Sequence, residues 1–103
     1  MKGMEDLMRQ AQLMQSKMAD IQQGLATVRV EGSSGGGMVR VTATGKQEIV
    51  SVTIEKSVIN ADEADMLQDL VTAAVNDALR HSRDLAEKEL SALTGGFKLP
   101  GFM

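Results

Sequence analysis

The chain contains no cysteine, tryptophan or tyrosine, and only one histidine, one proline and two phenylalanines among its 103 residues. Without cysteine it has no disulfide, no thiolate metal site and no cysteine nucleophile. His81 has no second histidine beside which to bind a metal. Its neighbours Ser82 and Asp84 point in different directions on one helix, so a Ser/His/Asp catalytic arrangement is excluded. We therefore expect no enzyme, no metal and no cofactor.

Long hydrophobic runs are also absent. The apolar runs fall far short of the ~20 residues that span a bilayer, and no charged-then-apolar leader opens the chain. These absences predict a cytoplasmic protein without a membrane partner. A length of 103 residues predicts one domain. Such a domain buries only roughly 60–70% of its unfolded surface, so a second copy would help to stabilise it.

Positive charge is not in excess, because the net charge is −3. Residues 1–56 carry seven basic and six acidic residues, whereas residues 57–103 carry four basic and eight acidic residues. Much of the acid stands at the start of an expected helix, where carboxylates interact favourably with the helix dipole. The composition therefore excludes a globally basic surface and leaves room for local basic patches.

Three short strands are expected in the middle of the chain, at residues 28–31, 38–44 and 48–54. In the last strand Val50, Val52 and Ile54 alternate with Ser51 and Thr53, which gives one apolar and one polar face. The other two strands show the same alternation. We expect a three-stranded antiparallel sheet whose apolar face is covered by the flanking helices.

Residues 4–25 are predicted to form an amphipathic helix, because apolar residues, many of them methionine, recur at spacings of three and four. We favour core filling for this methionine stripe, and an adaptable partner surface is the alternative. Residues 32–37, Gly-Ser-Ser-Gly-Gly-Gly, are interpreted as a flexible connection between strands. A phosphate cradle is the alternative, but the Lys-Ser/Thr ending of a P-loop is missing.

A second helix is predicted from about residue 62 to 93, with Asn60 and Glu63 resembling a capping box. At 1.5 Å per residue it is roughly 45 Å long, so it must overhang the sheet. Its apolar stripe rotates by roughly a quarter turn in the second half, which we expect to pair with the first helix or with a partner subunit. Residues 1–93 form the expected domain, and residues 94–103 form an expected flexible tail of Gly, Phe and Pro. The candidates for core or dimer packing are Met14, Met18, Ile21, Ala78, Leu79, Ala86 and Leu90.

Basic residues are the only functional lead that the residues themselves supply. Arg29 and Arg40 lie on the polar face of the expected sheet among threonines, and Arg and Thr are good phosphate partners. Further basic residues lie on the two helices. A two-fold dimer would double each patch. The candidates for DNA binding are Arg9, Lys17, Arg29, Arg40, Arg80, Arg83 and Lys88.

Four stretches resemble the YbaB/EbfC family of bacterial nucleoid-associated proteins. They are LMRQAQLMQSKM at residues 7–18, the glycine-rich turn that leads into VRV at residues 39–41, MLQDLVTAAVNDA at residues 66–78, and GFKLPG at residues 96–101. The resemblance covers nearly the whole chain in order. It implies an α+β fold of one helix, a three-stranded antiparallel sheet and a long helix (α-β-β-β-α), assembled as a tweezer-like homodimer.

The same resemblance implies binding of double-stranded DNA with little sequence preference, at the nucleoid, and a role in nucleoid organisation or gene expression. Among the candidates, it favours the helical residues Arg9, Lys17, Arg80, Arg83 and Lys88. The alternative is a protein-interaction or chaperone-like module of helix-hairpin-helix type. That class needs two roughly equal coiled-coil arms, and the first helix is expected to have only about 22 residues.

Overall fold

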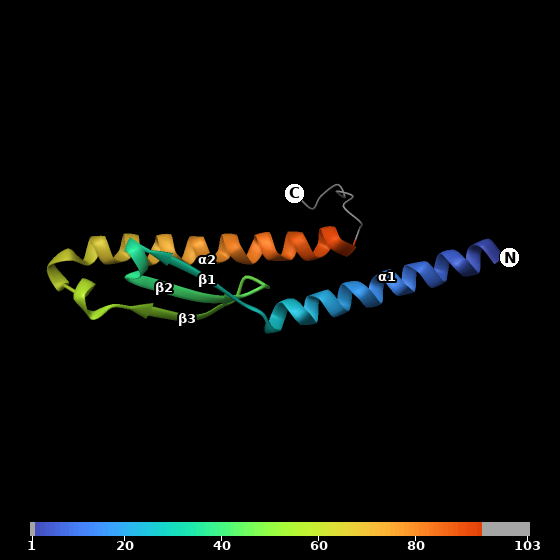
Figure 1. Ribbon diagram of the computed structural model, residues 1–103, viewed down its shortest axis with the longest axis horizontal. Helices are drawn as coiled ribbons and strands as arrows, with labels where there is room; N and C mark the ends of the chain where they lie inside the picture. The colour runs from blue at the N-terminus through green and yellow to red at the C-terminus, as the bar shows by residue number, and fades with distance from the viewer. Residues whose placement is uncertain (1, 94–103) are drawn as a thin grey trace.

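The computed structural model describes residues 2–93, and the predicted α+β order is confirmed (Figure 1). A long helix precedes the three-stranded sheet and a second long helix follows it. The elements are α1 (Lys2–Thr27), β1 (Arg29–Ser34), β2 (Val39–Thr44), β3 (Ile49–Ile54) and α2 (Ala64–Leu93). Residues 94–103, expected to form a tail, lie outside the described residues.

The sheet has the order β1-β2-β3 and both pairings are antiparallel, as expected. β1 is longer than predicted, because Gly32, Ser33 and Ser34 continue the strand and pair with Val41, Arg40 and Val39. Only Gly35–Gly37 form the turn, each with a positive φ. The interpretation of residues 32–37 as one flexible connection was therefore wrong in its first half.

Gly32 lies in the strand directly beneath α2, where only a residue without a side chain fits. A Cβ atom at this position would lie 2.1 Å from the backbone nitrogen of Ala78 and 2.6 Å from the carbonyl oxygen of Ala74. Ala74 and Ala78 are themselves fully buried. Three small residues thus allow the backbones of helix and strand to touch. A glycine at such a close approach is a packing residue rather than a hinge.

The core lies between α2 and two of the strands. Val39, Val41 and Ala43 of β2 are fully buried with Ala74 and Ala78 of α2. Ile54 at the end of β3 is partly buried against this core, but Ile49, Val50 and Val52 of the same strand remain 42–49% exposed. We expected the helices to cover the whole apolar face, and this was wrong. One helix is too narrow to cover three strands about 4.8 Å apart, and it lies over β1 and β2.

Helix α1 projects away from the sheet instead of covering it (Figure 1). Leu25, near its end, is the only buried residue among residues 3–27. Met4, Leu7 and Met8 are 64–67% exposed. Core filling for the methionine stripe is therefore wrong within a single chain. The body measures 73 × 23 × 16 Å because both helices extend past the sheet.

The edge of β1 is capped by side chains of α2. The Ser33 amide donates to the Asp77 carboxylate at 3.0 Å, and His81 Nδ1 donates to the Glu31 carbonyl. Residues four apart on a helix and two apart on a strand both rise about 6–7 Å, so the two elements match. Capping removes edge groups that could pair with another strand. Within the described sheet, β3 is left as the open edge.

Of the predicted capping box, Asn60 acts as a cap, but the Glu63 side chain makes no return hydrogen bond. The Asn60 side chain accepts from the Asp62 amide at 3.0 Å. A 3₁₀ turn at Ala61–Glu63 precedes α2, so the α-helix begins at Ala64, two residues later than expected.

Candidate nucleic-acid interface

Six basic side chains within residues 3–93 make no hydrogen bond or ion pair with another part of the chain. The structure places them on both helices, on the open face of the sheet, in the β2–β3 turn and in the 3₁₀ turn after β3. They are Lys17, Arg40, Lys46, Lys56, Arg83 and Lys88. Lys46 and Lys56 were not among the residues selected from the sequence.

Along α1, the predicted residues Arg9 and Lys17 are both exposed. Arg9 lies 3.7 Å from Asp6, and both side chains are well exposed, at 71% and 64%. An exposed pair of this kind contributes about 0–1 kcal/mol, so it costs little to open. Arg9 is therefore available to a phosphate, although Asp6 lowers the local positive charge.

On α2, Arg80 is engaged with the sheet-edge cap. Its guanidinium lies 2.7 Å from the Asp77 carboxylate. The Ser33 amide, followed by the Arg80 hydrogen bond and the charges of His81 and Arg80, lowers the pKa of Asp77 below its usual value. Since Asp77 stays ionised and holds Arg80, that arginine has a structural partner that competes with DNA.

Arg83 and Lys88 of α2 are exposed and have no partner within the described chain. Arg83 is five residues from Ala78, about 140° around the helix, so it points away from the sheet. Lys88 is five residues further and again about 140° away. The structure thus brings Arg83 beside Arg80, three residues before it, but leaves Lys88 on another face.

The two sheet candidates have different surroundings. The Arg29 guanidinium lies 3.3–3.4 Å from the carbonyl oxygens of Ala26, Thr27 and Val28, so it caps the end of α1. Arg40 lies on the open face, between Ser33 and Thr53 of the neighbouring strands in register, and has no such partner. Arg40 is therefore the more available of the two.

The β2–β3 turn is held by both helices. The Gly45 amide donates to the Leu25 carbonyl of α1 at 2.9 Å. The Gln47 amide donates to Ser82 Oγ of α2 at 2.9 Å, and Ser82 Oγ donates to the Thr44 carbonyl at 2.8 Å. Ser82 is fully buried. Ser82 is a polar residue within the apolar stripe of α2, and this was the one feature of the sequence that indicated a buried hydrogen-bond network at this position.

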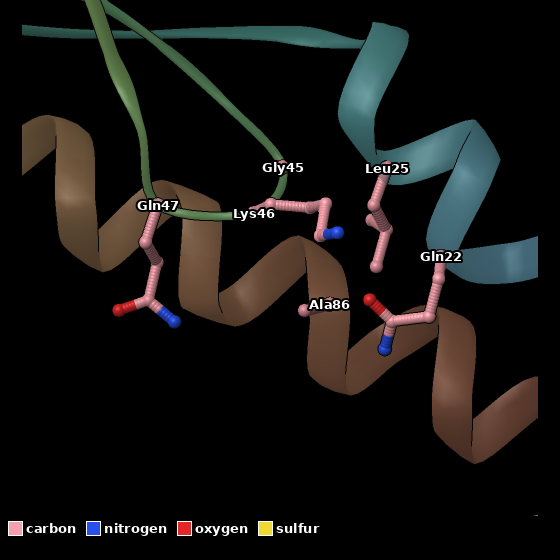
Figure 2. A pocket seen from close by; sticks show the side chains of 6 residues that line it. All are labelled: Gln22, Leu25, Gly45, Lys46, Gln47 and Ala86. Atoms are coloured by element: carbon pink, nitrogen blue, oxygen red, sulfur yellow. The ribbon is translucent and has the colours of Figure 1, made fainter.

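A shallow pocket of about 190 Å³ lies where α1, this turn and α2 meet (Figure 2). Lys46 reaches over Ala86 from the turn, Gln22 approaches from α1, and Gln47 points away from both. Lys46 is the one ionisable residue among the six that line the pocket. The pocket is lined by Gln22, Leu25, Gly45, Lys46, Gln47 and Ala86.

These features place exposed, unpartnered cations on two projecting helices and on their junction. A profile described as the YbaB/EbfC DNA-binding family matches residues 1–97 of the chain. The chain belongs to the YbaB/EbfC family. The family resemblance noted in the sequence is confirmed, and the family is one of nucleoid-associated DNA-binding proteins rather than a class of enzymes.

Relatives named nucleoid-associated proteins match this YbaB/EbfC member along nearly their whole length. A nucleoid-associated protein of Desulfotalea psychrophila is 55% identical over 94 residues, which cover 91% of this chain and 89% of that protein. A nucleoid-associated protein of Desulforamulus reducens is 49% identical over 99 residues, which cover 96% and 94%. The similarity therefore extends over both helices and the sheet.

The fold itself is shared with a solved structure. The crystal structure of an uncharacterized protein from Helicobacter pylori matches with a TM-score of 0.77 and 21% identity, covering 86% of this chain and 94% of that one. At this identity the match shows the common fold alone.

The packing candidates of this YbaB/EbfC chain divide into two groups. Ala78 is fully buried against the sheet. The other six are partly or largely exposed, with Met14 at 44%. The partly exposed residues are Met18, Ile21, Leu79, Ala86 and Leu90. The side chains of these six residues are therefore not fully buried within one chain.

A metal-binding cluster and a membrane-spanning helix are both absent from residues 2–93. That stretch contains no cluster of three or more His, Asp or Glu side chains able to hold a metal ion. Neither of its long helices is apolar over enough residues to cross a bilayer.

Proposed function

We propose that this YbaB/EbfC protein binds duplex DNA as a homodimer, largely through phosphate contacts, and acts in nucleoid organisation or the regulation of gene expression. Its place would be the cytoplasm, at the nucleoid. The observation that carries the proposal is the set of exposed cations without partners on α1 and α2, Lys17, Arg83 and Lys88, in a member of a DNA-binding family.

The net charge of −3 does not oppose this proposal. Phosphate binding depends on where cations lie, and it releases the counterions condensed on DNA. Acidic residues such as Asp77 are already engaged with protein groups. A two-fold dimer would present each exposed cation twice. Local patches can therefore bind DNA although the whole chain is acidic.

A second copy of the chain is the proposed cover for the exposed apolar surface. Val52 of β3 pairs with the buried Val41 and Ile49 pairs with the buried Ala43, yet 44% and 42% of their surface remains exposed. Exposed apolar patches of this kind mark interaction sites. Because the domain is small, burying this surface in a dimer would also add stability.

The DNA-binding proposal is tested by fluorescence anisotropy with a labelled duplex of mixed sequence, over a series of KCl concentrations, with light scattering on the same sample. We expect binding by a dimer, with an affinity that falls steeply as salt rises. The variant Arg83→Ala should lower the slope of log K against log[KCl] by about one for each phosphate that is no longer neutralised. An intact dimer that binds no duplex at low salt would refute the proposal.

A second candidate, a chaperone-like or protein-interaction module, is favoured by one observation. The first helix was expected to have about 22 residues, but α1 has 26 and α2 has 30. The arms are therefore nearly equal, and α1 exposes a methionine-rich stripe suited to adaptable binding. This candidate predicts that the protein suppresses aggregation of an unfolded client and that duplex DNA does not compete. DNA binding without client protection would exclude it.

A further inference from the structure

We propose that Lys46, at the tip of the β2–β3 turn, is a DNA phosphate-contacting residue that acts together with Arg83 of α2. This inference rests on the proposed function. It adds to the DNA-binding surface a contact at the β2–β3 turn, apart from the projecting ends of the two helices. Lys46 is exposed, and neither it nor Arg83 makes a hydrogen bond or ion pair through its side chain.

The position of Lys46 in the fold is the first argument. The turn lies at the junction from which α1 and α2 project, and the Lys46 side chain extends over Ala86 toward α1 (Figure 2). Arg83 is three residues before Ala86 and is therefore its neighbour on the surface of α2. Lys46 thus lines a pocket with Ala86, and Arg83 is a neighbour of Ala86 along α2, whereas Arg83 and Lys88 diverge along their own helix.

The rigidity of the turn is the second argument. The Lys46 amide donates to Thr44 Oγ1 at 3.1 Å. The amides on either side of it are bound by the two helices, Gly45 to the Leu25 carbonyl and Gln47 to Ser82 Oγ, each at 2.9 Å. Gly45 is also enclosed, because a Cβ atom there would lie 2.8 Å from a Leu25 methyl carbon. A cation on a backbone already held in place loses little backbone entropy when it binds.

The surroundings of Lys46 are the third argument. The pocket of about 190 Å³ contains no carboxylate among its lining residues. It offers the ammonium of Lys46 and the amide of Gln22, which can both donate to a phosphate oxygen. An uncompensated cation beside a neutral donor favours an anionic ligand, and the phosphate backbone is the anion that a DNA-binding protein meets.

The test compares Lys46→Gln with the wild type in anisotropy titrations against a mixed-sequence duplex over a series of KCl concentrations. Lys56→Gln is the matched control, since Lys56 is also exposed and unpaired but lies in the 3₁₀ turn after β3, at the far end of the sheet. We expect Lys46→Gln to lower the salt slope by about one for each phosphate that Lys46 neutralises, and to weaken binding to all sequences alike. Lys56→Gln should match the wild type, and Lys46→Arg should restore the slope.

The outcomes separate this inference from the function on which it rests. If the wild type binds DNA and Lys46→Gln has the same slope, the role of Lys46 is refuted and the proposed function stands. If the wild type binds no DNA, both are refuted. If Lys46→Gln dissociates the dimer while the salt slope per dimer is unchanged, Lys46 acts in the dimer contact, and its role toward DNA is refuted. Equal thermal unfolding of the variants excludes loss of the fold as the cause.

Discussion

Gly32 of β1 and Ala78 of α2 touch backbone to backbone: a Cβ atom at position 32 would lie 2.1 Å from the Ala78 nitrogen. This contact sets the distance between the sheet and the helix that carries Arg80, Arg83 and Lys88. Any side chain at position 32 would push α2 away from Val39 and Val41, which are fully buried beneath it. The glycine thus positions the candidate DNA-binding helix.

Replacing Gly32 with alanine should destabilise the protein by about 1–3 kcal/mol or more, since overpacking against backbone has no easy relief. Urea unfolding followed by circular dichroism measures this change. The control is Gly24→Ala, because no atom lies within 4 Å of the added Cβ in α1. Alanine there should be neutral or stabilising by about 0.5–1 kcal/mol. Equal stability of Gly32→Ala and the wild type would contradict the close contact.

Removing the Ser82 hydroxyl should also destabilise the fold. In Ser82→Ala, the Gln47 amide and the Thr44 carbonyl lose their buried partner, which costs about 1–3 kcal/mol. Thermal unfolding gives the measurement. Ser57→Ala is the control, since Ser57 is exposed and should change stability by no more than about 0.5 kcal/mol. If both variants unfolded alike, the turn would not depend on Ser82.

Asp77 should make stability depend on pH in the acid range. Its pKa is lowered from 3.8 in the folded protein, first by the Ser33 amide and then by Arg80. Ionised Asp77 therefore adds stability at pH values above 3.8, and this contribution is lost as the pH falls through the lowered pKa of the folded state. Compared with Asp77→Asn, the wild type should be more stable at pH 7, and the difference should shrink below about pH 4. Urea midpoints of both proteins at several pH values provide the check, and a difference that does not vary with pH would count against it.

The exposed face of β3 should carry the dimer contact. Val52→Asp places a charge in the centre of this face and should raise the dimer dissociation constant by about tenfold or more. The fold should persist, because Val52 is already 44% exposed in one chain. Dilution series by analytical ultracentrifugation measure the constant. Thr53→Asp puts the same charge on the opposite face, so it should leave the dimer intact. If Thr53→Asp alone dissociated the dimer, the contact would lie on the open face.

Local patterns were sufficient to predict the kind and order of the elements. Alternation in residues 50–54 predicted a strand with one apolar face, and the spacing of apolar residues predicted both long helices. Asn60 predicted a cap, which forms at 3.0 Å. These features depend on residues close together in the chain, where backbone geometry and periodicity act directly.

The site could be predicted only as a set of basic residues. The sequence identified Arg29, Arg80 and Arg83 as candidates and favoured the two on the helix, but the structure shows that Arg29 caps α1 and that Arg80 is held by Asp77. Lys46 was missed because its significance depends on α1 and α2 meeting beside the turn. Whether a cation is already occupied depends on contacts between residues far apart in the chain.

The sequence by itself determined two amphipathic helices around an antiparallel sheet, because hydrophobic periodicity is a local property. Tertiary structure decided how much of each apolar face is covered. It placed α2 on β1 and β2 through Gly32, left β3 exposed, and let α1 project with its methionines uncovered. The reason is geometric, since one helix spans only about two strands. Periodicity identifies the apolar face of each element. Only the folded chain shows which part of that face stays exposed and is available to a partner.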